Sequence, residues 1–351
     1  MVFTTSGTTG APKMVVHSHR SIAVHARSAA DGFGITADDT VLAVMPLCGT
    51  FGLATLMSAL AGDATIVLPD RFEPESTAAL VRRHRVTVTH GSDDMFHRLL
   101  THDADLGTLR IAGHARFNAS LDDIVERADQ RGATLVGLYG MSEVQALFAH
   151  RDGDATREER ARAGGRPVSD DATFRVVDGE LQLRGPSLFE GYLAHGGGHV
   201  DRALTDAHLD DGWFRTGDLA IVDPVTTTFT FLTRMGDAMR LGGFLVAPAE
   251  IEDVVLELPG VVDTQVVAAE LPSGTRPVAF VILDRGATFD AAAAHAHCAE
   301  RLSRHKVPVR FEPVEHFPVT DGPNGVKVRR DELRRVATNV LGAGGADRPP
   351  A

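Results

Sequence analysis

The chain has 351 residues, with 35 basic against 47 acidic side chains and a formal net charge of −12. This charge excludes a general electrostatic attraction to nucleic acid or to an anionic membrane, and no run of about 18 apolar residues is present that would span a bilayer. Hydrophobic residues make up 43% of the chain and charged residues 23%, which is typical of a globular protein large enough for two or three domains.

The first half of the chain alternates short β-branched runs with helical patterns, which is typical of a parallel sheet covered by helices. Strands are expected at Val41–Met45, Ala64–Leu68, Val86–Thr89 and Thr134–Leu138. Helices are expected at Pro74–His84, at Leu121–Arg131, and in a segment that Ser92 caps and that runs through Leu100.

The pattern changes twice further along the chain. From about Ala172, short runs broken by Gly and Asp predict a small antiparallel region with strands at Phe174–Val177, Leu181–Arg184 and Thr228–Leu232. After Arg234 the pattern predicts a helix at Pro248–Leu258, strands at Val262–Ala268 and Val278–Leu283, and a helix at Ala291–Arg304.

These elements predict an α/β protein. A core domain over residues 1–236 comprises an α/β part at about 1–170 and a β region at about 171–234, and a compact α+β domain follows over 237–341. The Gly- and Pro-rich tail 342–351 is expected to be disordered. Two distant cysteines, and a first segment with neither a basic nor an apolar run, predict a cytoplasmic location.

Lysine is rare in this chain. Only Lys13, Lys306 and Lys327 are lysines, and all other basic residues are arginines. Arginine replaces lysine easily on a solvated surface, but it is a planar fork, whereas lysine is a compact charge on a flexible stem. The retained lysines are therefore candidates for positions where a fork does not serve, although chance retention is the better explanation for any one of them taken alone.

A loop of glycines and hydroxyls that ends in a lysine opens the chain at Thr5, Ser6, Gly7, Thr8, Thr9, Gly10 and Lys13. Glycines let backbone amides approach an anion, and the hydroxyls and the lysine add donors and charge, so the loop favours phosphate binding. It is not a Walker loop, which needs four residues between its glycines and a hydroxyl residue after its lysine. A plain flexible loop is the alternative.

The loop, with the residues that follow it, resembles the phosphate loop of the adenylate-forming (AMP-binding) acyl-CoA synthetase superfamily. Further stretches resemble later motifs of that family, in the family's order, at 137–143, 179–186 with 191–192, 213–218, 234–237, 242–252 and 324–327. Together the matches extend from residue 3 to about residue 335. The resemblance implies an enzyme that uses ATP and Mg²⁺ to activate a carboxylic acid.

The resemblance also implies roles for single residues. The phosphate loop would hold the β- and γ-phosphates through Lys13, and Lys327 would be the catalytic cation that bridges the substrate carboxylate and the α-phosphate. Glu143 would hold Mg²⁺. The other nucleotide-binding positions would be Tyr139 on adenine, Gly140 beside it, Ser142 on the α-phosphate, and Asp218 and Arg234 on the ribose.

Three more sets of positions follow from the same resemblance. The acid pocket would include Gly49, Gly137 and Met141, and Asp237 would be the hinge about which a mobile C-terminal domain turns. Gly242 and Gly243 would line a tunnel for the thiol acceptor, coenzyme A, because glycine lets a thin pantetheine arm pass close to the backbone. Lys306 falls on a common family position without an assigned role.

Two features depart from the family pattern. Cys48 and Gly49 stand where an aromatic residue and a histidine are usual, so the identity of the acid is open. A stretch of subdomain size precedes the phosphate loop in the family, whereas here the loop starts near residue 4. We therefore expect exposed apolar surface that a partner chain or a second copy of this chain covers, unless the sequence is a fragment.

The function predicted from these residues is ATP-dependent formation of an acyl-adenylate from a small carboxylic acid, with release of pyrophosphate, and transfer of the acyl group to coenzyme A. One alternative is an adenylating enzyme that uses another acceptor, such as a carrier protein or an amine. A second is a truncated, non-catalytic nucleotide-binding subunit. A generic phosphotransferase is disfavoured because Walker and kinase signatures are absent from the sequence.

Overall fold

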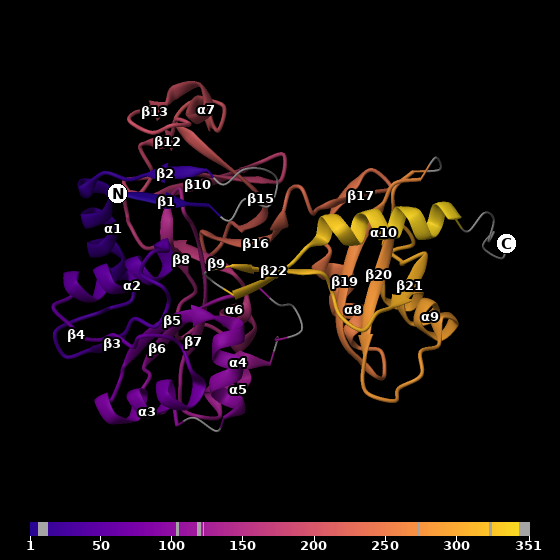
Figure 1. The fold of residues 1–351 in the computed structure, drawn as a ribbon, viewed down its shortest axis with the longest axis horizontal. Helices are drawn as coiled ribbons and strands as arrows, with labels where there is room; N and C mark the ends of the chain where they lie inside the picture. The colour runs from indigo at the N-terminus through magenta and orange to yellow at the C-terminus, as the bar shows by residue number, and fades with distance from the viewer. Residues whose placement is uncertain are drawn as a thin grey trace. The chain divides into compact units, whose positions relative to one another are not determined.

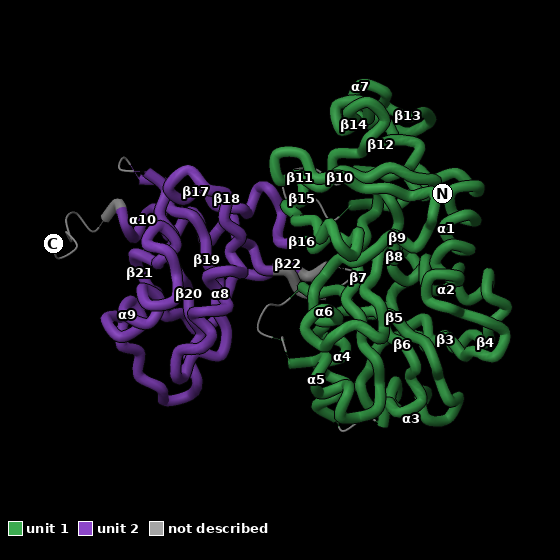
Figure 2. Tube along the Cα trace, turned by 180° about the vertical axis from the view of Figure 1, so that it is seen from behind, with its two compact units in different colours: residues 1–231, 322–325 green, residues 232–321, 326–351 purple. Residues whose placement is uncertain are grey.

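A computed structural model of the chain describes residues 1–5, 13–102, 105–117, 121, 123–271, 274–322 and 325–343; for residues 321, 322, 325–327, 342 and 343 it describes the backbone alone. The chain forms two compact units, which Figure 2 distinguishes by colour. The first comprises Met1–Phe231 with Gly322–Gly325, and the second Leu232–Asp321 with Val326–Ala351. Among the described helices, none combines the length and the hydrophobicity that crossing a bilayer requires.

Parallel strands and their helices build most of the first unit, as predicted (Figure 1). The strands are β3 (Thr40–Leu42), β4 (Thr65–Val67), β5 (Val88–Ser92), β6 (Ile111–Ala115) and β7 (Leu135–Met141), in the order β4-β3-β5-β6-β7. The helices are α1 (His19–Gly32), α2 (Thr50–Ala61), α3 (Pro74–His84), α4 (Asp93–Thr101), α5 (Ile124–Asp129) and α6 (Arg157–Ala161).

Local signals explain where two of these helices begin and end. Helix α3 begins at Pro74 and ends before Arg85, which adopts the left-handed conformation. Helix α4 begins after Ser92, whose hydroxyl accepts a hydrogen bond from the amide N–H of Met95, as the sequence predicts.

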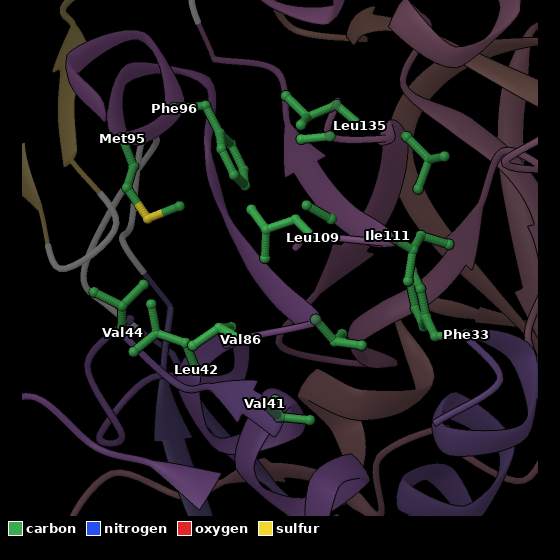
Figure 3. Close-up of a cluster of buried hydrophobic side chains, with 14 of the residues drawn as sticks. Phe33, Val41, Leu42, Val44, Val86, Met95, Phe96, Leu109, Ile111 and Leu135 are labelled. Atoms are coloured by element: carbon green, nitrogen blue, oxygen red, sulfur yellow. The ribbon is translucent and has the colours of Figure 1, made fainter. Parts of the chain in front are cut away.

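Figure 3 shows the hydrophobic core that the helices and strands of the first unit enclose, with buried side chains such as Phe33, Phe96 and Leu135.

The same sheet continues through antiparallel strands. They are β8 (Gln145–His150), β9 (Gly164–Pro167), β10 (Thr173–Val177), β11 (Glu180–Arg184), β14 (Leu209–Asp210), β15 (Trp213–Asp223) and β16 (Thr228–Arg234). A separate small sheet contains β1 (Val2–Thr4), β2 (Met14–Val16), β12 (Gly191–Leu193) and β13 (Val200–Asp201), beside helix α7 (Arg202–Asp206). The predicted β region is thus present.

The second unit is an α+β domain with hydrophobic clusters on both faces of one sheet. Its elements are β17 (Met239–Leu241), β18 (Phe244–Val246), α8 (Ala249–Leu256), β19 (Val261–Ala269), β20 (Arg276–Leu283), α9 (Ala291–Arg301), β21 (Arg310–Pro313) and α10 (Arg330–Ala343). Strands β22 (Val319–Gly322) and β23 (Gly325–Val328) precede α10. Neighbouring strand residues point to opposite faces, so Val266 packs with α8 and α9 while Val267 packs with α10.

Several boundaries differ from those expected. The helix expected at Leu121–Arg131 is the shorter α5, and the one expected to reach Arg304 ends at Arg301, because extended Leu302 turns back to pack against the core. The units divide after Phe231 instead of residue 236. Helix α10 extends to Ala343, into the segment expected to be a disordered tail, and residues 344–351 lie outside the described residues.

A buried ion pair joins α10 to the rest of its unit. Glu252, which is 1% exposed, accepts hydrogen bonds from the Arg330 guanidinium and the Val266 amide, each at 2.8 Å. Burial raises the pKa of Glu252, and the charge of Arg330 opposes this rise. The carboxylate therefore depends on Arg330 to remain ionised.

Replacing Arg330 by methionine is expected to destabilise the second unit by about 3 kcal/mol at neutral pH, because it leaves a buried carboxylate without its cation. The variant's deficit should shrink as pH falls towards 5, since protonation of Glu252, whose pKa is raised in the folded state, removes the unpaired charge. Amide hydrogen exchange in α10 at pH 5 and pH 7.5 measures this. The control is Glu252→Gln with Arg330→Met, whose deficit should not vary with pH; a pH-independent deficit in the single variant would contradict the account.

Candidate active site

The predicted phosphate loop connects two paired strands of the small sheet. Strands β1 and β2 are antiparallel, with Thr4 opposite Met14. Beyond them the Thr5 amide donates to the Lys13 carbonyl at 2.9 Å, and the Lys13 amide donates to the Thr5 hydroxyl at 3.0 Å. The two ends of the loop are thus held together, while its candidate residues Ser6, Gly7, Thr8, Thr9 and Gly10 lie outside the described residues.

Lys13 and Glu143 are brought together by Tyr192. The Lys13 ammonium nitrogen lies 4.9 Å from the centre of the Tyr192 ring, and the hydroxyl of Tyr192 donates to Glu143 Oε1 at 2.8 Å. Both Tyr192 and Glu143 are buried. The predicted phosphate cation and the predicted magnesium ligand therefore contact the same aromatic side chain, the cation over its ring and the carboxylate at its hydroxyl.

A second cluster joins the predicted adenine and ribose residues. The hydroxyl of Tyr139, on β7, donates to Asp218 Oδ2, on β15, at 2.6 Å, and both side chains are buried. The ring of Tyr139 packs edge-on against Phe229. Met141, predicted for the acid pocket, places its sulfur 3.6 Å from the same hydroxyl. Residues that are 79 positions apart in sequence thus meet at one place in the first unit.

The turn between β7 and β8 carries Ser142 and Glu143 and is fixed from outside. The Ser142 carbonyl accepts from His17 Nε2 at 2.7 Å. Burial lowers the pKa of His17, so its ring is neutral at pH 7 and orients the turn without adding charge. A side chain at Gly140 would place its Cβ 2.6 Å from Ala146 Cα, which explains the glycine.

The remaining acid-pocket candidates have local structural roles. A Cβ at Gly137 would lie 2.1 Å from the Arg162 carbonyl oxygen, so a close backbone approach already requires this glycine. Gly49 is the residue before α2, and Cys48 beside it is exposed. The role of Gly49 and Gly137 in the acid pocket stays a prediction.

The other predicted residues belong to the second unit. Asp237 forms an ion pair with Arg334 at 3.1 Å, and Arg234 ends β16. Gly242 and Gly243 form the two-residue turn between β17 and β18, with φ of 59° and 88°, where any other residue would be strained. Lys327 lies on β23, of which the structure describes its backbone alone. Lys306 forms an ion pair with Glu250.

Sequence reasoning missed His208, whose Nε2 lies 2.8 Å from the Lys13 ammonium nitrogen. It also named Tyr192 only as part of a motif. The sequence held one signal for Tyr192, since the chain has only two tyrosines. In the structure both tyrosine hydroxyls donate to carboxylates of the candidate site. No local pattern marks His208, because its contact with Lys13 spans 195 residues.

The donor set around Glu143 fits a magnesium ion held largely by a substrate. Across the described ranges, no group of three or more His, Cys, Asp or Glu side chains is placed to hold a metal. Mg²⁺ commonly takes one or two carboxylates, with phosphate oxygens and water completing its shell. The buried carboxylate of Glu143, joined through Tyr192 to Lys13 at the end of the predicted phosphate loop, meets that requirement.

Comparisons with known proteins identify the family. Residues 1–193 match the model of the AMP-binding enzyme family, and residues 250–321 match that of its C-terminal domain. The chain therefore belongs to the AMP-binding enzymes, which confirms the family and the fold class predicted from the sequence.

Among curated proteins, the chain is 34% identical to a dioxo-octahydro-indenyl propanoyl:CoA ligase of Mycobacterium tuberculosis, over 88% of this chain and 62% of that protein. It is 29% identical to 2-succinylbenzoate–CoA ligase of Listeria monocytogenes, over 95% and 69%. Among solved structures, ATP-bound MatB from Rhodopseudomonas palustris has a TM-score of 0.83 at 26% identity, over 97% and 68%. The chain spans about two thirds of the length of these relatives.

Proposed function

We propose that this chain activates a small carboxylic acid with ATP and transfers the acyl group to the thiol of coenzyme A. The observation that carries the proposal is the joining of Lys13 to Glu143 through Tyr192, with Tyr139 and Asp218 paired in the same unit. Relatives named as CoA ligases, and solved structures with bound ATP, support it.

In the first half-reaction, a carboxylate oxygen of the acid attacks the α-phosphorus, and the bond to the β-phosphate breaks to release pyrophosphate. The phosphate loop and Lys13 would hold the β- and γ-phosphates, and Ser142 the α-phosphate. Tyr139 and Gly140 would lie against adenine, while Asp218 and Arg234 would accept and donate hydrogen bonds at the ribose. Mg²⁺ on Glu143 would neutralise charge on the phosphate oxygens.

In the second half-reaction, the thiol sulfur attacks the acyl carbon and AMP leaves. We assign Lys327 to the first step, where a flexible cation offsets the charge that develops between carboxylate and phosphate. Asp237 would be the hinge of a mobile C-terminal domain. The turn at Gly242 and Gly243 would line the path of the pantetheine arm, and Gly49, Gly137 and Met141 the acid pocket.

The test is acid-dependent ATP–pyrophosphate exchange over a panel of aryl, short-chain and long-chain carboxylic acids, followed by AMP release with and without coenzyme A. Exchange with one acid class, and AMP release that needs coenzyme A, are the expected results. ATP binding without exchange for any acid would instead favour a non-catalytic nucleotide-binding subunit.

One structural comparison favours a second acceptor. The amide bond synthetase McbA from Marinactinospora thermotolerans has a TM-score of 0.80 with this chain at 26% identity, over 95% of this chain and 68% of that one. The assay therefore also includes an amine or a carrier-protein thiol in place of coenzyme A. Product analysis by mass spectrometry separates a thioester from an amide.

We also propose a cytoplasmic location, and a partner chain or second copy that covers apolar surface. Strand β4 lies at the end of the strand order of its sheet, and Leu68, which follows it, is exposed; this sheet edge supports the second proposal. Native mass measurement of the active protein tests it: a fully active monomer would overturn it.

A further inference from the structure

His208 contacts the candidate phosphate-binding lysine with one ring nitrogen and the backbone with the other. Its Nε2 lies 2.8 Å from the Lys13 ammonium nitrogen, and its Nδ1 lies 2.9 Å from the Leu204 carbonyl oxygen. The ring is half-buried and follows helix α7 in the first unit. His208 is therefore held between a fixed backbone group and a flexible side chain.

The two contacts select one form of the histidine. A carbonyl oxygen only accepts hydrogen bonds, so Nδ1 must carry a hydrogen to bond with Leu204. An ammonium group only donates, so Nε2 must keep its lone pair to bond with Lys13. The neutral ring with its hydrogen on Nδ1 satisfies both partners. The other neutral form, and the protonated ring, would each present a donor to the lysine.

Tyr192 completes the surroundings of the lysine. The His208 and Tyr192 rings meet edge to face with centres 5.1 Å apart, and Lys13 lies over the same Tyr192 ring. The Tyr192 amide donates to the Thr205 hydroxyl at 3.0 Å, which ties α7 to β12. We call Lys13, His208, Tyr192 and Glu143 the lysine cluster. It connects Lys13, at the end of the predicted phosphate loop, to the candidate magnesium ligand.

We propose that His208 is a positioning residue that holds the Lys13 ammonium ready for the phosphates of ATP; the proposal rests on the proposed function. A free lysine loses rotamer entropy when it binds a phosphate, and a preformed contact removes part of that loss. A neutral acceptor also leaves the positive charge uncompensated, whereas a carboxylate in its place would compete with the phosphate. Among the described residues, this contact uses one of the three ammonium hydrogens of Lys13.

The test compares two substitutions. His208→Phe keeps a ring against Tyr192 but removes the acceptor, and His208→Gln supplies an amide oxygen at about the distance of Nε2. The KM for ATP is expected to rise about tenfold in His208→Phe, as expected for a lost hydrogen bond to a charged group, and to return to within about threefold in His208→Gln. The kcat, and the KM for the acid, should stay within about twofold in both variants.

Kinetics, calorimetry and NMR together test the role of His208. An unchanged KM for ATP in His208→Phe, or an equal rise in the KM for the acid, would overturn the role of His208. Calorimetric titration of the wild-type chain with Mg·ATP separates this outcome from failure of the proposed function, which would appear as no ATP binding and no exchange. Nitrogen NMR of the wild-type chain reports the ring form directly, even if a variant fails to fold, and a hydrogen on Nε2 would contradict the proposal.

Discussion

Replacing Lys327 by alanine is expected to lower acid-dependent ATP–pyrophosphate exchange by about 100- to 1000-fold, the effect of removing one preorganised group that stabilises transition-state charge. Affinity for Mg·ATP should change by less than about threefold, because Lys13 and the loop hold the β- and γ-phosphates in the proposed mechanism. Lysine suits this role because a compact charge on a flexible stem can follow the moving oxygens. Exchange kinetics with a fixed acid, beside calorimetric ATP binding, measure both effects.

Two further variants make this prediction specific. Lys306→Ala is the matched control: it removes a lysine of the same unit that pairs with Glu250, and exchange should stay near the wild-type rate. Lys327→Arg keeps the charge but changes its shape, and we expect it to recover only a small part of the activity. Pyrophosphate release by Lys327→Ala at the wild-type rate would refute the assigned role.

The stability of the first unit is expected to fall steeply as the pH drops from about 6 to 4. Burial lowers the pKa of His25 and His114 to about 4, and that of His90 to about 3, from an ordinary value of 6.5. These rings are neutral when folded and take up protons on unfolding. Each contributes stability that is complete above pH 6.5 and is lost towards its folded pKa, at about 1.4 kcal/mol per pH unit.

A single substitution tests this origin. The Gly113 amide donates to His90 Nδ1 at 3.0 Å, so His90→Asn can keep an acceptor while removing the titrating ring. Urea unfolding between pH 7.5 and 4.5 should show a slope with pH that is lower than that of the wild-type chain by up to about 1.4 kcal/mol per pH unit, the contribution of one histidine. The control is His295→Asn, whose exposed side chain on α9 should leave the slope unchanged. Equal slopes in all three proteins would contradict the assignment.

Much of the architecture follows from local pattern. Helix α3 has a proline at its start and a cluster of basic residues at its end, and the sequence predicts both of its ends. No bounds are predicted for helix α2 between its two strands, because its apolar residues surround the whole helix and leave no amphipathic period. Strand β7 extends through Met141 because its end pairs with β8. Strand propensity, which is a property of single residues, does not predict such a pairing.

Some features of the candidate site could likewise be predicted from the sequence, and others could not. Motif order identifies Tyr139, Glu143 and Asp218, since each belongs to a recognisable stretch. The pairing of Tyr139 with Asp218, and of Tyr192 with Glu143, depends on strands that meet only in the folded chain. His208 lies outside all the stretches that resemble family motifs, so only the structure reveals its contact with Lys13.

The scarcity of lysine has a practical consequence for handling this protein. Beyond the N-terminus, the chain offers three amino groups to amine-directed reagents, and two of them are assigned to the proposed chemistry. Coupling to an amine-reactive support, or fixation with an aldehyde, therefore lacks the harmless surface lysines that absorb such treatment in most proteins. Activity should be lost early in modification, and peptide mapping by mass spectrometry with and without Mg·ATP would show which of the two assigned lysines the nucleotide protects.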